Sequence, residues 1–129
     1  MTCDLAPASL VNSALGTDLG APSQTTAGSA TACEYKGTKA GAVEIRIQTG
    51  DSAAIFAVER KAFDATGQRT KSYPGFGDEA FINVKHMPLS LPDVNTLVAR
   101  QGSVEILVVS TASLTAEQTL EQQLFAKVK

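Results

Sequence analysis

One segment of the chain alternates apolar and polar residues without a break. Within residues 42–49, Val43, Ile45 and Ile47 alternate with glutamate, arginine and glutamine. Because successive side chains of a β-strand point to opposite faces, this pattern predicts a strand with one buried face and one hydrated face. Half-buried strands are typical of antiparallel sheets, whereas strands of parallel sheets are apolar on both faces. We therefore expect an antiparallel sheet to organise the fold.

Residues 96–110 predict a hairpin in the same sheet. Strands over 96–100 and 103–110 flank the tight turn Gln101-Gly102. The returning strand is apolar on both faces over its second half, which favours a central place in the sheet. Glycine, proline and short apolar patterns predict the remaining segments. These are strands over 31–36 and 79–84, a turn over 36–41, and loops over 17–30 and 68–78.

Three segments have apolar residues at helical spacing. The first follows Pro7 and ends before Gly16. The second has Asp51 as its expected N-cap and runs to about Thr66, and the third begins near Thr115. The expected order of elements is α-β-β-α-β-β-β-α. We expect a single α+β domain over residues 1–129, sandwich-like, with three helices and a mainly antiparallel sheet of about five strands.

The composition excludes several classes of protein. The chain has 11 Lys and Arg against 13 Asp and Glu, and a formal net charge of −2 argues against a nucleic-acid-binding protein. An apolar share of 43% is too high for a disordered chain. No apolar run approaches the roughly 20 residues that a membrane-spanning helix needs. We expect no nucleic-acid partner, no transmembrane segment, no metal and no cofactor.

The two cysteines, Cys3 and Cys33, leave three interpretations open. A disulfide between them would fasten a loosely packed N-terminal segment to the sheet and would suit an oxidising compartment. Two free thiols in a reducing compartment are the second interpretation. In the third, Cys3 carries a lipid, although no small apolar lipobox precedes it. The chain begins without a signal peptide, so Met1 is either a native start or a start placed before a mature secreted domain.

The single histidine, His86, limits the catalytic options. With Asp78 and Glu79 it offers the one combination for a small hydrolase-like enzyme, but the spacing matches neither a metal site nor a nucleophile site. A structural interpretation explains the same segment, because the glycines beside Phe76 permit positive φ, Phe76 fills the core and Asp78 bonds backbone amides. We therefore predict no catalytic residue.

Two surface features are candidates for binding. A basic patch near the end of the second expected helix is a candidate anion contact: Arg60, Lys61, Arg69 and Lys71. Apolar residues among prolines in the connection over 85–95 are candidate contacts for a partner or ligand: Met87, Leu89 and Leu91. Each feature has a structural alternative, which is a solvated face for the patch and a loop that covers the core for the connection.

Several short motifs together carry a resemblance. Cys3-Asp4-Leu5, Leu15-Gly16 and Cys33 follow a "cysteine, x, leucine, then leucine-glycine, then cysteine" pattern. Residues 75–81 read GFGDEAF and residues 97–102 read LVARQG. These features resemble a family of small secreted proteins and lipoproteins of actinobacteria and related bacteria, largely of unknown function. The resemblance implies export, an α/β sandwich and a Cys3–Cys33 disulfide, and it carries over no catalytic residue.

These observations favour a non-enzymatic exported domain that binds a protein partner or a small ligand at the cell envelope. We expect the protein to be secreted or attached to the envelope, in a mature form whose signal peptide is missing from this chain. One alternative is the hydrolase-like enzyme that uses Asp78, Glu79 and His86. Another is a structural or self-associating envelope protein.

Overall fold

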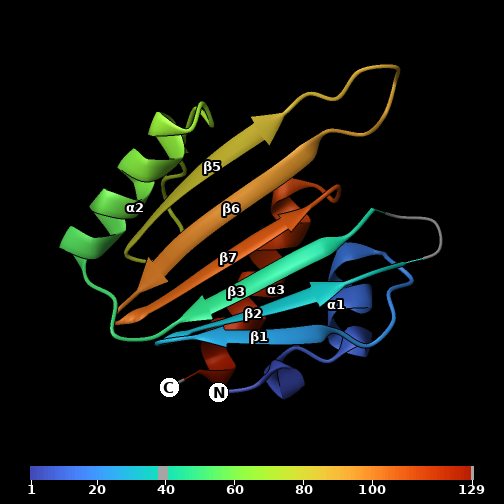
Figure 1. The fold of residues 1–129 in the computed structure, drawn as a ribbon, viewed down its shortest axis with the longest axis horizontal. Helices are drawn as coiled ribbons and strands as arrows, with labels where there is room; N and C mark the ends of the chain where they lie inside the picture. Colours follow the sequence, from blue (N-terminus) through green and yellow to red (C-terminus); the bar gives the residue numbers. More distant parts are fainter. Residues whose placement is uncertain (38–40, 129) are drawn as a thin grey trace.

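The computed structural model describes residues 1–37 and 41–128 and has an α+β fold, as predicted. One antiparallel sheet of seven strands has the order β1-β2-β3-β7-β6-β5-β4 (Figure 1). The strands are β1 (Ser23–Ala27), β2 (Ala30–Tyr35), β3 (Val43–Gln48), β4 (Lys71–Ser72), β5 (Glu79–Lys85), β6 (Val94–Gln101) and β7 (Val104–Ser110). The helices are α1 (Ala8–Leu15), α2 (Ala53–Ala65) and α3 (Leu114–Lys127), and a short 3-10 helix, η1 (Cys3–Leu5), precedes them. The centre of the turn predicted over 36–41 lies outside the described residues.

The prediction of about five strands is wrong, because two more strands lie in segments that the sequence predicts to be loops. β1 is polar and fully exposed, so it lacks the alternation of a half-buried strand. It forms because the two-residue turn Gly28-Ser29, with Gly28 at φ 60°, folds it back onto β2. β4 has only two residues and exists through the pairing of Lys71 with Ile82 and of Ser72 with Phe81.

The helices lie in separate layers on the two faces of the sheet (Figure 1). α1 and α3 pack together on one face, and α2 covers β5, β6 and β7 on the other. β7 lies between β3 and β6, which confirms the central place predicted for it. Its Ile106 and Val108 face the α1–α3 layer, whereas Leu107 faces α2.

The two layers enclose two hydrophobic cores. The larger core, under α1 and α3, buries Ile45, Leu97 and Leu120 completely. The smaller core, under α2, is mainly aromatic. Phe56 and Phe63 of α2 each meet the ring of Phe81 edge to face, with ring centroids 5.2 and 5.4 Å apart.

Two expected helix starts need correction. Ser52 rather than Asp51 caps α2, because the Ser52 hydroxyl accepts a hydrogen bond from the Ile55 N–H at 3.2 Å. Ser113 rather than Thr115 caps α3 and accepts from the Ala116 N–H at 3.1 Å. In both cases a serine lies one or two residues from the expected cap. Its hydroxyl oxygen accepts a hydrogen bond from a backbone N–H of the first helical turn, which is the bond expected of the predicted cap. Asp51 is thereby free to turn toward the sheet, where it is buried.

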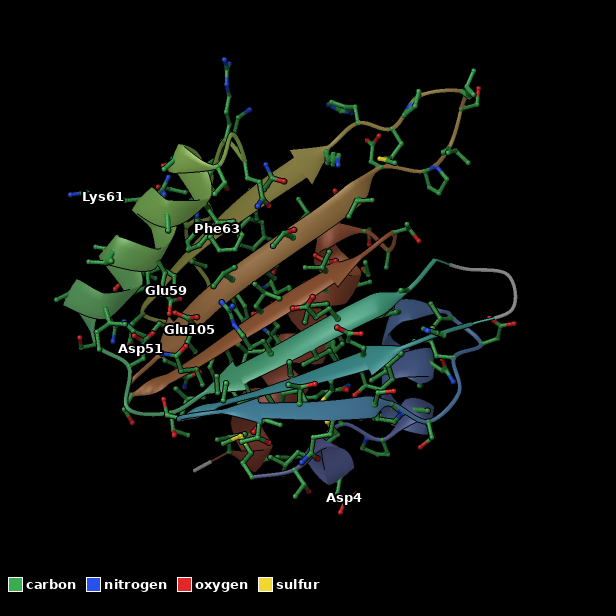
Figure 2. The ribbon with its side chains drawn as sticks, viewed as in Figure 1. Asp4, Asp51, Glu59, Lys61, Phe63 and Glu105 are labelled. Atoms are coloured by element: carbon green, nitrogen blue, oxygen red, sulfur yellow. A yellow bond between two sulfur atoms is a disulfide. The ribbon has the colours of Figure 1, made fainter. Side chains whose placement is uncertain are left out.

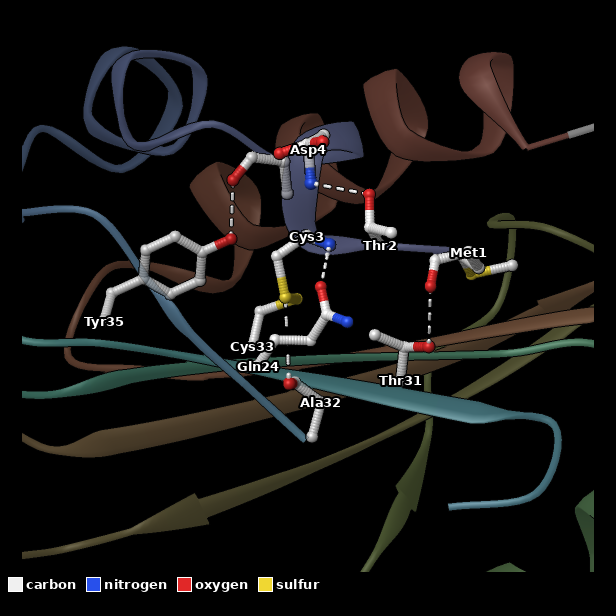
Figure 3. Close-up of a disulfide and its surroundings, with 10 residues drawn as sticks. Met1, Thr2, Cys3, Asp4, Gln24, Thr31, Ala32, Cys33 and Tyr35 are labelled. Carbon is white, nitrogen blue, oxygen red and sulfur yellow. Dashed lines mark hydrogen bonds between the residues drawn. A yellow bond between two sulfur atoms is a disulfide. The ribbon is translucent and has the colours of Figure 1, made fainter. Parts of the chain in front are cut away.

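The structure confirms the disulfide between Cys3 and Cys33, so neither two free thiols nor a lipid on Cys3 fits it. The bond joins η1 to β2 on the face of the sheet that α1 and α3 cover (Figure 3). Two further contacts hold the same segment. The Cys3 N–H donates to Gln24 Oε1 at 2.8 Å, and the Tyr35 hydroxyl donates to the Ala6 carbonyl at 2.6 Å. The N-terminal segment is therefore fixed to both β1 and β2.

We predict that replacing both Cys3 and Cys33 by alanine lowers the free energy of unfolding by about 3–4 kcal/mol, because the bond closes a long loop in the unfolded chain. The two cysteines are 30 residues apart. Urea unfolding followed by circular dichroism measures the change. Reducing agent should destabilise the parent protein by a similar amount and leave the double variant unaffected. Two free thiols in the untreated protein, counted by mass spectrometry, would contradict the prediction.

Candidate functional site

The three residues of the hydrolase-like alternative do not meet. Asp78 and Glu79 lie at the start of β5 and hold Arg100 of β6. Arg100 donates to Glu79 Oε2 at 2.8 and 3.0 Å, and Asp78 Oδ2 accepts from the Gly102 N–H at 2.7 Å. His86 follows the other end of β5, roughly 20 Å away along a strand that rises about 3.3 Å per residue. There its Nδ1 lies 3.1 Å from Asp93 Oδ1.

The segment before β5 is shaped by its glycines and by Phe76. Gly77 has φ 63°, and a Cβ atom there would lie 2.7 Å from the Arg100 carbonyl oxygen. Phe76 is buried against Phe125 of α3, with ring centroids 6.1 Å apart. Asp78 and Glu79 therefore join the β5 start to the β6–β7 turn, as the structural interpretation of this segment expects.

A groove with a basic lining lies at the opposite end of β5. It has a volume of about 730 Å³ and runs between the end of α2 and the outer edge of β5. We call it the basic groove. Its lining residues are Thr66, Gly67, Gln68, Arg69, Lys71, Ile82, Asn83, Val84, Lys85 and His86.

The charge of the basic groove has one sign. Arg69, Lys71 and Lys85 are cationic, His86 adds a titratable base, and no carboxylate is among the described residues that line the groove. Within the described part of the chain, no ion pair joins the side chain of Arg69, Lys71 or Lys85 to a carboxylate. A concave surface with unpaired cations attracts anions.

Local structure places these cations on the lining of one groove. α2 ends at Ala65, and Gly67 turns the chain with φ 85° so that it runs back along β5. The Asn83 amide donates to the Arg69 carbonyl at 2.8 Å, which fixes the returning segment to the strand. The pairing of Lys71 with Ile82 then sets Lys71 on the same sheet edge as Lys85.

The four basic residues predicted as one patch divide between two grooves. Arg69 and Lys71 line the basic groove, whereas Arg60 and Lys61 line a second groove of about 570 Å³ beside residues 72–80. Arg60 is engaged, because it donates to the Thr70 and Ser72 hydroxyls at 2.9 and 3.0 Å. Figure 2 shows Lys61 pointing away from the sheet.

The sequence alone does not indicate Lys85 as a binding residue. It is 14 residues from Lys71, and only the β4–β5 register brings the two together. The one usable signal is the return of the chain after Gly67 toward the strand predicted over 79–84.

The apolar connection forms the loop between β5 and β6, and it projects beyond the sheet (Figure 1). Leu89 at its tip is 92% exposed and Leu91 is 55% exposed, whereas Met87 is half-buried. Leu89 and Ser90 have φ values of 60° and 61°, which are unfavourable for residues with a side chain. The loop begins directly after Lys85, so the apolar tip and the basic groove adjoin along the chain.

A cluster of carboxyl groups that the sequence did not predict lies under the first half of α2 (Figure 2). Asp51 precedes the helix, Glu59 lies on it, and Glu105 lies on β7 with 1% exposure. Arg46 of β3 is the neighbouring cation, and its Nη2 lies 3.5 Å from Glu105 and 3.9 Å from Glu59. Burial, and then the closeness of Glu59 and Asp51, raises the pKa of Glu105 to about 10.

Two more glutamates are fully buried on the other side of the sheet. Glu117 and Glu121 lie one turn apart on α3 and face the larger core. Burial raises the pKa of Glu117 to about 9, and a hydrogen bond from the Ser110 hydroxyl opposes part of this rise. Burial, and then the neighbouring Glu117 and Glu105, raises the pKa of Glu121 well above its usual range. The pKa values of Glu105, Glu117 and Glu121 therefore all lie above the ordinary range of a glutamate.

None of these acidic groups forms a metal centre. Within residues 1–37 and 41–128, no group of three His, Cys, Asp or Glu side chains is arranged to hold a metal ion. None of the helices in the same ranges has the length and apolar character that a membrane crossing requires.

No protein-family model, no curated protein and no solved structure matches this chain.

We predict that the free energy of unfolding falls as the pH rises from about 5 to about 8, by about 1.4 kcal/mol per pH unit for each buried glutamate that stays protonated. The ordinary pKa of these glutamates is 4.5, so above this pH the unfolded chain loses protons that the folded protein keeps. Each buried glutamate thus stabilises the fold fully below pH 4.5. This stabilisation decreases as the pH rises from 4.5 to the pKa of the group in the folded protein, which for Glu117 is about 9. Urea unfolding at several pH values measures the slope.

Glu117→Gln assigns part of this slope to one group. The amide oxygen still accepts from Ser110, but the side chain no longer titrates. We expect a shallower pH dependence and a higher stability at pH 8. Glu34→Gln, at an exposed position on β2, is the control and should leave the slope unchanged. A stability that is level or rises between pH 5 and 8 would show that these glutamates ionise inside the fold.

Proposed function

We propose that this protein is an exported, non-catalytic binding module of the cell envelope that holds an anionic partner in the basic groove. The observation that carries the proposal is the lining of that groove. Its three unpaired cations and one histidine lie together in a chain whose formal net charge is −2. Such a local reversal of charge is a feature of surfaces that bind anions.

The energetics of the groove support an anionic occupant. Arg69, Lys71 and Lys85 repel one another, and no described carboxylate in the lining offsets this repulsion. An anion with several charges would relieve it and would release counterions into the solvent. The side chains are exposed, so the attraction is screened by salt and is strongest for a polyanion.

Two observations support export and a role without catalysis. A disulfide in a small domain suits an oxidising compartment, which agrees with the secreted proteins that the Cys3 and Cys33 motifs resemble. Asp78 and Glu79 are held in bonds with Arg100 and the β6–β7 turn, far from His86. This arrangement favours a binding module over the hydrolase-like alternative.

Charge reversal tests the groove. Polyphosphate serves as the probe, and heteronuclear NMR titration should show shifts confined to the lining of the basic groove. Lys71→Glu with Lys85→Glu should weaken binding at least about tenfold, because each reversal replaces an attraction by a repulsion. Lys36→Glu with Lys61→Glu changes the net charge equally at two exposed sites outside the groove, so binding should decrease far less. Equal losses in both double variants would contradict the proposal.

Self-association is a second candidate, and one observation favours it. β1 is an edge strand of five residues, all exposed, without a charge or a proline within it. Edges of this kind pair with other strands unless lysine, proline or a bulge blocks them. An antiparallel β1–β1 contact between two copies would place no like charges opposite each other.

Thr25→Lys tests this contact at the centre of β1. Size-exclusion chromatography with light scattering at two concentrations measures the mass. We expect a mass that rises with concentration in the parent protein and stays monomeric in the variant, since edge lysines oppose strand pairing. A monomeric parent protein at both concentrations would remove this candidate.

A further inference from the structure

The β5–β6 loop and the basic groove adjoin, but they offer different chemistry. The loop residues from Met87 to Pro92 carry no charge, and two leucines are exposed at the tip. The groove begins at the base of the same loop, with Lys85 and His86 in its lining. Arg69 and Lys71 stand across the groove on the neighbouring segment.

We infer that this end of the molecule docks on a bilayer that contains anionic lipids, with Leu89 and Leu91 in the lipid and the groove cations against the headgroups. This inference rests on the proposed function, because it names the lipid headgroups as the anionic partner. The protein would lie on the bilayer surface, held by one apolar contact and several charges.

The form of the loop favours a lipid surface over a protein partner. Leu89 is 92% exposed on a projecting tip, so a protein partner would need a matching cavity. A protein interface of ordinary stability also covers about 800 Å² on each side, more than a short loop tip offers. A fluid bilayer accepts a convex apolar tip without such a cavity.

The charges around the tip complement anionic headgroups. Lys85 and His86 lie at one base of the loop, and Asp93 at the other base is the one carboxylate between residues 86 and 93. Asp93 Oδ1 lies 3.1 Å from His86 Nδ1, and among the described residues no ion pair joins Asp93 to Lys85. Headgroup phosphates would therefore meet Lys85, Lys71 and Arg69 while the leucines enter the acyl region.

Tryptophan fluorescence gives a direct test, because the chain contains no tryptophan. Leu89→Trp places a single reporter at the tip, and Val58→Trp places one at a 67% exposed position on α2. With vesicles of phosphatidylcholine and about 30% phosphatidylglycerol, the Leu89→Trp emission should shift to shorter wavelength and the Val58→Trp emission should not. Vesicles of phosphatidylcholine alone should give a much smaller shift.

Vesicle sedimentation separates the two contributions. Leu89→Ser with Leu91→Ser should weaken binding to the anionic vesicles at least about tenfold and leave polyphosphate binding unchanged. Ile55→Ser with Val58→Ser removes two exposed apolar residues of α2 and should change neither. Lys71→Glu with Lys85→Glu should weaken binding to both probes. All of these positions are exposed, so circular dichroism should show folded variants.

The outcomes distinguish the inference from the proposed function. Binding of polyphosphate without binding of anionic vesicles overturns the inference and leaves the proposed function in place. Vesicle binding that is insensitive to the leucine variants, or equal on neutral and anionic vesicles, also overturns it. Failure of both probes overturns the inference and the proposed function together.

Discussion

The structure depends on the double coverage of β7. This strand pairs with β3 on one side and β6 on the other, and its two faces belong to different cores. The α1–α3 layer buries Ile106 and Val108, and α2 buries Leu107. Loss of either layer would expose an apolar face of the central strand to water. The two layers are therefore coupled through β7, although they lie on opposite faces of the sheet.

The parts of the fold that follow from local pattern were predictable. Alternation identified β3, the tight turn at Gly102 identified the β6–β7 hairpin, and apolar spacing with Gly16 identified α1. β1 is not predicted, because a strand that buries neither face shows no alternation of apolar and polar residues. The one sequence signal for it is the turn at Gly28. β4 is not predicted, because a segment of two residues forms a strand only by pairing with another strand, here β5.

The candidate site was less predictable, since tertiary register decides which charges meet. The β4–β5 pairing brings Lys71 and Lys85 to the lining of one groove. Arg60 does not line that groove, and its guanidinium donates to the hydroxyls of Thr70 and Ser72 instead. The buried carboxyls follow the same logic. Nothing in the strand predicted over 103–110 indicates that Glu105 is buried, and it is the position of α2 over β7 that buries it. Long-range packing, rather than local sequence, assigns the unusual chemistry of this protein.

The disulfide has a mechanical consequence. It closes a covalent ring that contains α1 and β1, so tension applied at Met1 passes through the sulfur atoms directly into β2 at Cys33. The polypeptide between Cys3 and Cys33 bears none of this tension. Under force η1, α1 and β1 would therefore stay shielded until the sulfur–sulfur bond is reduced. A thiol reaction would thus decide which part of the sheet resists stretching.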